Sequence, residues 1–74
     1  MKGGDYMLYT DSLRASRQQA GMTLEQVAEH LNISKMAVSN WECGKGTAPN
    51  ISRLIQLADL YSVSVDELIG RKEA

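Results

Sequence analysis

Four side chains that can make contacts with a polar ligand lie close together in the middle of the chain: Lys35, Met36, Ser39 and Asn40. Residues four apart share one face of an α-helix, so Lys35 with Ser39 and Met36 with Asn40 would form a single surface. A helix that enters the major groove of DNA needs an outward face of short polar side chains, because bulky or acidic groups would clash or be repelled. These four residues form such a face.

The sequence contains few residues that could form a metal site, a disulfide or a catalytic centre. His30 and Cys43 are the single histidine and the single cysteine of the chain, so neither a disulfide nor a Cys/His metal site is expected. The sequence also has no glycine-rich phosphate loop and no carboxylate pair with a plausible cleft. We therefore expect no enzyme activity, no metal, no cofactor and no small-molecule ligand.

The size and composition favour one small helical domain. With 74 residues, 43% of them hydrophobic and none of them Phe, the interior must be built from Leu, Ile, Val, Met and Ala. No apolar run approaches the roughly 20 residues of a membrane span, and the first residues do not resemble a signal peptide. A cytoplasmic protein without membrane contacts is expected.

The net charge of −1 is low for a protein that binds nucleic acid, but the charge is unevenly distributed. Residues 14–53 carry five basic side chains against three acidic ones, whereas residues 54–74 carry two against four. The face that contains residues 35–40 therefore belongs to the more basic part of the chain.

Capping signals and apolar spacing predict five helices. A leader over residues 1–9 precedes a first helix that begins at Asp11 or Ser12, has Leu13, Ser16 and Ala20 on one stripe, and stops at Gly21. Thr23-Leu24-Glu25-Gln26 and Ser64-Val65-Asp66-Glu67 are capping boxes that open the second and fifth helices. Ser34 and Asn50 are expected to cap the third and fourth helices, and Gly44 and Gly70 to end the third and fifth.

The apolar spacing indicates which helix faces are buried. Leu24, Val27, Ala28 and Leu31 form the inner stripe of the second helix, and Ala37, Val38 and Trp41 that of the third. In the fourth helix the expected stripe is Ile51, Leu54, Ile55 and Ala58, flanked by Leu57 and Tyr61. Asn32-Ile33-Ser34 then joins the second and third helices as a tight helix-turn-helix unit.

The order and spacing of these segments resemble the lambda Cro and C1-type (XRE-like) helix-turn-helix family over about residues 12 to 70. The segments that match the family pattern are Leu13-Arg14-Ala15-Ser16-Arg17, Gly21 to Ala28, Leu31-Asn32-Ile33-Ser34, Val38-Ser39-Asn40-Trp41-Glu42, Gly44-Lys45, Pro49, and Val63 to Leu68. The resemblance implies a compact five-helix, all-α, lambda-repressor-like domain over residues 10–70, with residues 71–74 as a short tail. It also implies a prokaryotic or phage-encoded protein associated with the nucleoid.

The resemblance places Lys35, Met36, Ser39 and Asn40 where family members contact base edges. The Asn40 amide can make a bidentate pair with adenine, and Lys35 suits guanine acceptors. The alternative is that Lys35 and Ser39 are solvated and that Met36 packs or only touches a thymine methyl. By the same resemblance Arg17 and Glu42 form a structural salt bridge between the first helix and the end of the recognition helix.

Contacts to phosphates are expected from the capped start of the second helix and from the loop after the third, at Thr23, Lys45, Gly46 and Thr47. The alternative is that Thr23 only caps its helix and Lys45 is solvated. Many relatives have Gln at the position of Leu24, where it binds phosphate. Leucine cannot make that contact, so it is missing here.

Double-stranded DNA is the expected partner, bound by a homodimer, because one recognition helix reads only about four base pairs. The residues proposed for the dimer interface are Tyr61, Val63, Val65, Leu68 and Ile69. The alternative is that all five close the core of the monomer.

The sequence therefore predicts a sequence-specific transcriptional regulator, a repressor that occupies a palindromic operator. A restriction-modification controller is a variant of this interpretation. The competing interpretation is an antitoxin, or another interaction partner, that also binds its own promoter, since one fold serves both roles.

Overall fold

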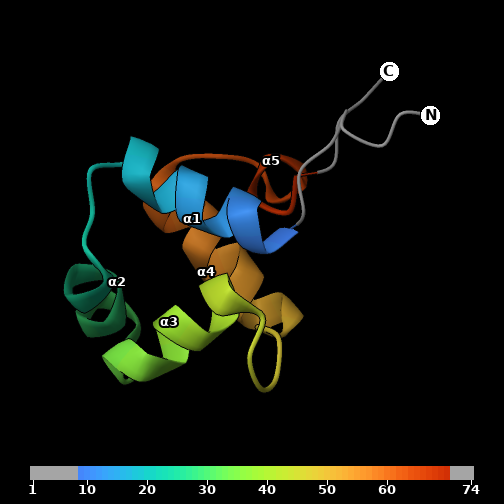
Figure 1. Ribbon diagram of the computed structural model, residues 1–74. Helices are drawn as coiled ribbons and strands as arrows, with labels where there is room; N and C mark the ends of the chain where they lie inside the picture. The colour runs from blue at the N-terminus through green and yellow to red at the C-terminus, as the bar shows by residue number, and fades with distance from the viewer. Residues whose placement is uncertain (1–8, 71–74) are drawn as a thin grey trace.

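The computed structural model describes residues 9–70, and within this range the chain forms five α-helices. They are α1 (Tyr9–Gln19), α2 (Leu24–Leu31), α3 (Lys35–Cys43), α4 (Ile51–Tyr61) and α5 (Val65–Leu68) (Figure 1). This confirms the predicted all-α fold. The predicted leader and the tail over residues 71–74 lie outside the described residues, with the exception of Tyr9.

The first helix begins earlier than its sequence predicts. Its first residue is Tyr9, so Asp11 is not an N-cap but lies in the first turn. There its negative charge interacts favourably with the positive N-terminal end of the helix dipole. Ala20, expected on the buried stripe, is exposed and follows the helix end, and the buried residues of α1 are Ser12, Leu13 and Ser16.

The predicted capping residues occupy their positions. Thr23 and Ser64 form reciprocal capping boxes with Gln26 and Glu67, respectively. The Ser34 hydroxyl accepts a hydrogen bond from the Ala37 amide at 3.1 Å, which satisfies one amide of the first turn of α3. Each helix of the helix-turn-helix unit therefore begins at a residue that the local sequence specifies.

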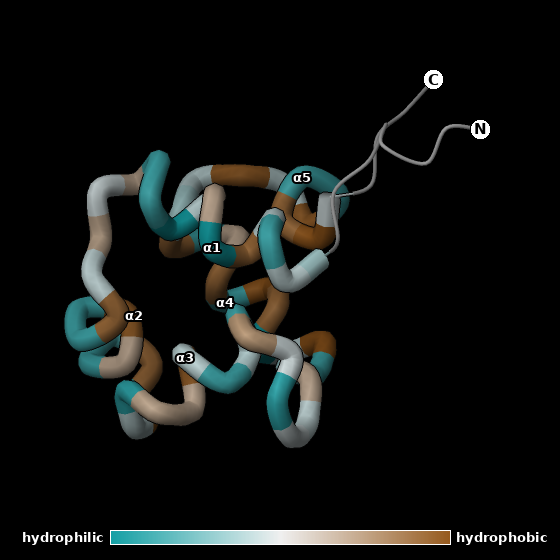
Figure 2. The backbone as a smooth tube through the Cα atoms, viewed as in Figure 1, coloured by the Kyte–Doolittle hydropathy of each residue, from teal (hydrophilic) through white to brown (hydrophobic). Residues whose placement is uncertain are grey.

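The core receives side chains from every helix. Its fully buried members are Leu13, Val27, Val38, Leu57 and Leu68, one from each of the five helices. Helix α1 packs on α3, α4 and α5, while α2 packs on α3 and α4 on α5. In Figure 2 the apolar stretches of α4 lie in the middle of the molecule.

Helix α4 buries a different face from the one that its spacing predicts. Leu57, Ala58 and Tyr61 are buried, whereas Ile51 and Ile55 are 64% and 48% exposed. The set Leu54, Leu57, Ala58 and Tyr61 has the same helical spacing as the predicted stripe, so periodicity could not distinguish the two faces. Packing against the other helices selects the inner set and leaves Ile51 and Ile55 at the surface.

Each helix in the described part of the chain is too short or too polar to span a bilayer.

Candidate nucleic-acid interface

Helices α2 and α3 are joined by a turn of three residues, Asn32, Ile33 and Ser34. Asn32 adopts the left-handed conformation (φ 59°, ψ 46°), and its amide donates to the carbonyl groups of Ala28 and Glu29. The amide of Ile33 also donates to Ala28, at 3.0 Å. These bonds satisfy the last carbonyls of α2 and direct the chain into α3, so the turn fixes one helix against the other.

The four residues predicted to contact bases share the side of α3 that faces away from the core. Lys35 and Met36 are exposed, Met36 by 70%, and Ser39 and Asn40 are half-buried. Val38, on the opposite side, is 1% exposed and holds the helix in the core. The structure therefore brings these four side chains together on one accessible surface, which we call the α3 face.

An acidic side chain that the sequence analysis did not single out also reaches the α3 face. The carboxylate of Glu25, in the first turn of α2, lies 3.0 Å from the Lys35 ammonium. The hydrogen bond from Lys35, with its positive charge, keeps the pKa of Glu25 below its ordinary value. No local signal could have identified this pair, because it depends on the angle between two helices.

The residues predicted to contact phosphates are Thr23, Lys45, Gly46 and Thr47, and all four are exposed. The Thr23 amide donates to Gln26 Oε1 at 2.9 Å, and the Thr23 hydroxyl accepts from the Gln26 amide at 3.1 Å. The hydroxyl proton of Thr23 is not used in this capping box, so Thr23 can cap α2 and still donate to an acceptor outside the protein.

The loop over residues 45–50 follows α3 and is held at both ends. Gly44 and Gly46 have φ of 74° and 68°, a left-handed conformation that favours glycine, and Pro49 is buried. Asn50 then caps α4 by accepting from the Arg53 amide at 2.9 Å. These features anchor Lys45 and Thr47 beside the end of α3.

Arg17, which is half-buried, and Glu42, which is buried, form an ion pair that ties α3 to α1. Arg17 Nε and Nη2 donate to the two carboxylate oxygens of Glu42 at 2.8 and 2.9 Å, and Arg17 Nη1 donates to the Met22 carbonyl at 3.0 Å. Glu42 is only 5% exposed. Such a two-pronged contact fixes the orientation of both side chains.

A second arginine, not predicted for this role, adds to that connection. Arg14 Nη2 donates to the Glu42 carbonyl at 3.1 Å. The end of α3 is therefore held through both the side chain and the backbone of Glu42.

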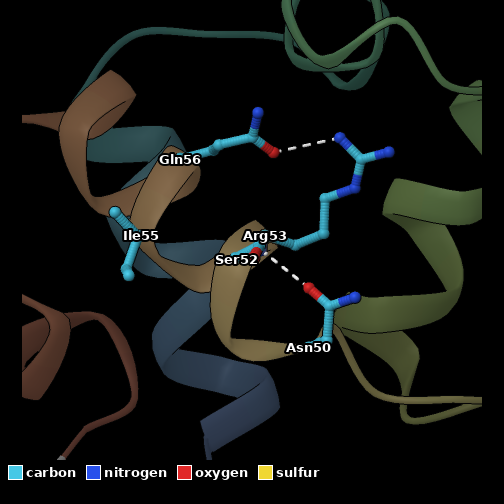
Figure 3. A pocket seen from close by; sticks show the side chains of 5 residues that line it. All are labelled: Asn50, Ser52, Arg53, Ile55 and Gln56. Carbon is cyan, nitrogen blue, oxygen red and sulfur yellow. Dashed lines mark hydrogen bonds between the residues drawn. The ribbon is translucent and has the colours of Figure 1, made fainter.

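Helix α4 is tied to the helix-turn-helix unit by Arg53, whose guanidinium donates to the Leu31 carbonyl at 3.3 Å and to Gln56 Oε1 at 3.0 Å. Figure 3 shows Arg53 and Gln56 meeting on one side of a surface pocket, while Ile55 points away from Arg53. This contact with the last residue of α2 was also not predicted, because the partner is a backbone atom 22 residues away.

The predicted dimer residues fall into two groups. Leu68 and Tyr61 are 0% and 6% exposed, so these two side chains belong to the core of the single chain and offer almost no surface to a second copy. Val63, Val65 and Ile69 are half-buried. Ile51 and Ile55, which the sequence analysis assigned to the core, are the larger exposed apolar surface.

Comparison with known proteins relates most of the described region to one family. The model of the helix-turn-helix family matches residues 13–68. The chain is 39% identical over 67 residues to the HTH-type transcriptional activator BcrR of Enterococcus faecalis, and 41% identical over 61 residues to the HTH-type transcriptional regulator ImmR of Bacillus subtilis. These matches cover 90% and 82% of this chain but 32% and 47% of the relatives, so the chain spans half or less of their length.

Two further matches are a phage protein and a crystal structure. The cryptic phage CTXphi transcriptional repressor RstR of Vibrio cholerae is 32% identical over 65 residues, which are 88% of this chain and 57% of that protein. The crystal structure of a transcriptional regulator from Listeria innocua superposes with a TM-score of 0.75 at 30% identity, covering 93% of this chain and 63% of that one.

Proposed function

This chain belongs to the helix-turn-helix family, and from that premise we propose that it is a transcriptional regulator that binds double-stranded DNA. Helix α3 lies in the major groove, and the start of α2 contacts the phosphate backbone. The observation that carries the proposal is the α3 face, where four side chains of suitable size are exposed or half-buried. The opposite side of the same helix packs in the core through Val38.

Base recognition is assigned to Asn40, Lys35, Ser39 and Met36. The Asn40 carboxamide can donate to and accept from one adenine, and the Lys35 ammonium can donate to guanine oxygen and nitrogen acceptors. Met36 can contact only apolar groups, such as a thymine methyl. Asn40 makes the most specific of these contacts.

Phosphate contacts are assigned to the Thr23 hydroxyl, the Lys45 ammonium, the Gly46 amide and the Thr47 hydroxyl. The Arg17–Glu42 pair supports them indirectly, because it holds α3 against α1 and keeps the loop that follows α3 in place. Few of these groups are charged, so a single copy would bind weakly and a pair of copies would bind with clear salt dependence.

We assign the chain a repressor role as a homodimer on an inverted repeat, with half-site centres about 34 Å apart. Val63, Val65 and Ile69 remain candidates for the interface, and the exposed pair Ile51 and Ile55 adds apolar surface on α4. A repressor acts here by occupying its operator against polymerase.

Selection from randomised duplex DNA, followed by sequencing, tests the proposal. We expect enrichment of an inverted repeat by the wild type, and loss of that enrichment in Asn40→Ala. Gln18→Ala is the matched control, because Gln18 loses the same type of side chain from an exposed position on α1. A wild type that enriches no sequence even at low salt would contradict the proposed function.

A further inference from the structure

The ion pair between Glu25 and Lys35 connects the two halves of the helix-turn-helix unit. Glu25 is the second residue of α2 and Lys35 is the first residue of α3. Their side chains are 67% and 56% exposed, and their charged groups are 3.0 Å apart. The pair therefore spans the outside of the unit, where water and ligands can reach it.

This position places a negative charge on the proposed DNA-binding surface. Glu25 follows Thr23 by two residues, and Lys35 is the first residue of the α3 face. A carboxylate that touches the Lys35 ammonium must approach the same groove and phosphates as the ammonium does. Phosphates repel carboxylates, so charge attraction to DNA alone gives no reason for an acid here.

We propose that Glu25 is a positioning residue that holds the Lys35 ammonium away from phosphates until a base acceptor replaces the carboxylate. The inference rests on the proposed function, since it assumes that the α3 face contacts bases. On non-operator DNA, Lys35 stays paired with Glu25 and adds no contact with the phosphates. On the operator, the Lys35 ammonium donates hydrogen bonds to guanine acceptors in place of its contact with Glu25.

The strength of the pair fits this role. An exposed ion pair has an equilibrium constant for formation of only about two to five. A ligand group that binds the ammonium more strongly can therefore break it. A good contact between a side chain and a base edge discriminates by roughly fivefold to a hundredfold. A base acceptor can therefore displace Glu25, whereas a loosely placed phosphate in hydrated, salt-screened surroundings competes with the carboxylate much less well.

The slope of the logarithm of affinity against the logarithm of salt concentration separates this mechanism from plain repulsion. If Glu25→Gln frees Lys35 to bind a phosphate on random duplex DNA, that slope steepens by about 0.9, the value for one additional phosphate contact. The slope on the operator should stay as it is, because Lys35 contacts a base there. Affinity for the operator should rise by about two- to fivefold, because the ion pair no longer has to be broken there.

The experiment uses the full chain and four variants. Glu29→Gln removes an equal charge from an exposed site on α2 that forms no ion pair within residues 9–70, and should leave both slopes unchanged. Glu25→Gln is also measured in a Lys35→Gln background, where its effect on the random-DNA slope should disappear. In Lys35→Gln alone, the carboxyl pKa of Glu25, followed by NMR, should rise toward its ordinary value.

Three results would overturn the inference: Glu25→Gln steepens both slopes equally, its effect persists without Lys35, or neither slope changes. Each of these leaves the proposed function intact as long as the selection finds an operator. Failure to enrich any operator counts instead against the proposed function. The slope on random DNA and the Glu25 pKa report on the pair in either case.

Discussion

Tyr61 is a residue whose ionisation the fold opposes. Burial in the core, together with the nearby Glu42 carboxylate, raises the pKa of its phenol to about 12 from an ordinary value of 10. The folded state binds this proton more tightly than the unfolded state does. The resulting stabilisation is complete below pH 10 and is lost as the pH rises through 10 toward 12.

This linkage predicts the alkaline stability of the wild type relative to Tyr61→Phe. Between pH 9 and pH 11.5 the wild type should lose about 2 kcal/mol more unfolding free energy than the variant, because phenylalanine has no proton to release. Urea denaturation at a series of pH values measures the difference. Tyr9→Phe, at a residue that is 38% exposed, should keep the alkaline loss of the wild type, and an equal loss in Tyr61→Phe would contradict the linkage.

At the scale of the helices, the N-caps are the features that the sequence predicts best. Thr23, Ser34, Asn50 and Ser64 accept hydrogen bonds from amides only three residues ahead, so residue type and spacing suffice to identify them. The family match over residues 13–68 likewise confirms the resemblance to the Cro/C1-type helix-turn-helix family, which rests on the order of such segments.

Features that depend on how helices pack were not predictable in the same way. The face of α4 that carries Ile51 and Ile55 was assigned to the core because two stripes of that helix have equal spacing. The contacts of Arg14 and Arg53 with distant carbonyls, and that of Lys35 with Glu25, join different elements. A pattern read along one helix contains no information about the angle at which its neighbour crosses.

The cap of α3 leads to a prediction about that helix. Ser34→Ala removes the acceptor of the Ala37 amide and should lower the unfolding free energy by about 1 kcal/mol. The first turn, which carries Lys35 and Met36, would fray and affinity for the operator would fall. Ser52→Ala, at an exposed position in the first turn of α4 that is not the N-cap, is the matched control and should change stability by less than about 0.5 kcal/mol. Equal effects of the two substitutions would exclude a capping role for Ser34.

At the scale of the whole molecule, the exposed isoleucines of α4 are candidates for the proposed contact between two copies. If Ile51 and Ile55 lie in the proposed dimer interface, Ile55→Ser should weaken self-association by about tenfold, because apolar surface loses its burial. Analytical ultracentrifugation over a range of concentrations measures this change. Met36→Ser, at a residue that is also exposed but lies on the α3 face, should leave self-association unchanged. A wild type that remains monomeric with and without operator DNA would rule out the dimer.

Arg53 links the surface that carries Ile55 to the helix-turn-helix unit. The same helix that presents Ile55 holds the last carbonyl of α2 through the Arg53 guanidinium, and α2 packs on α3. A contact made at Ile55 by a second copy would therefore be linked through α4 and α2 to α3 in each copy. In two copies joined in this way, the distance between the two α3 helices would be fixed. Such a dimer would bind operators of one half-site spacing and would reject half-sites that are a few base pairs closer or farther apart.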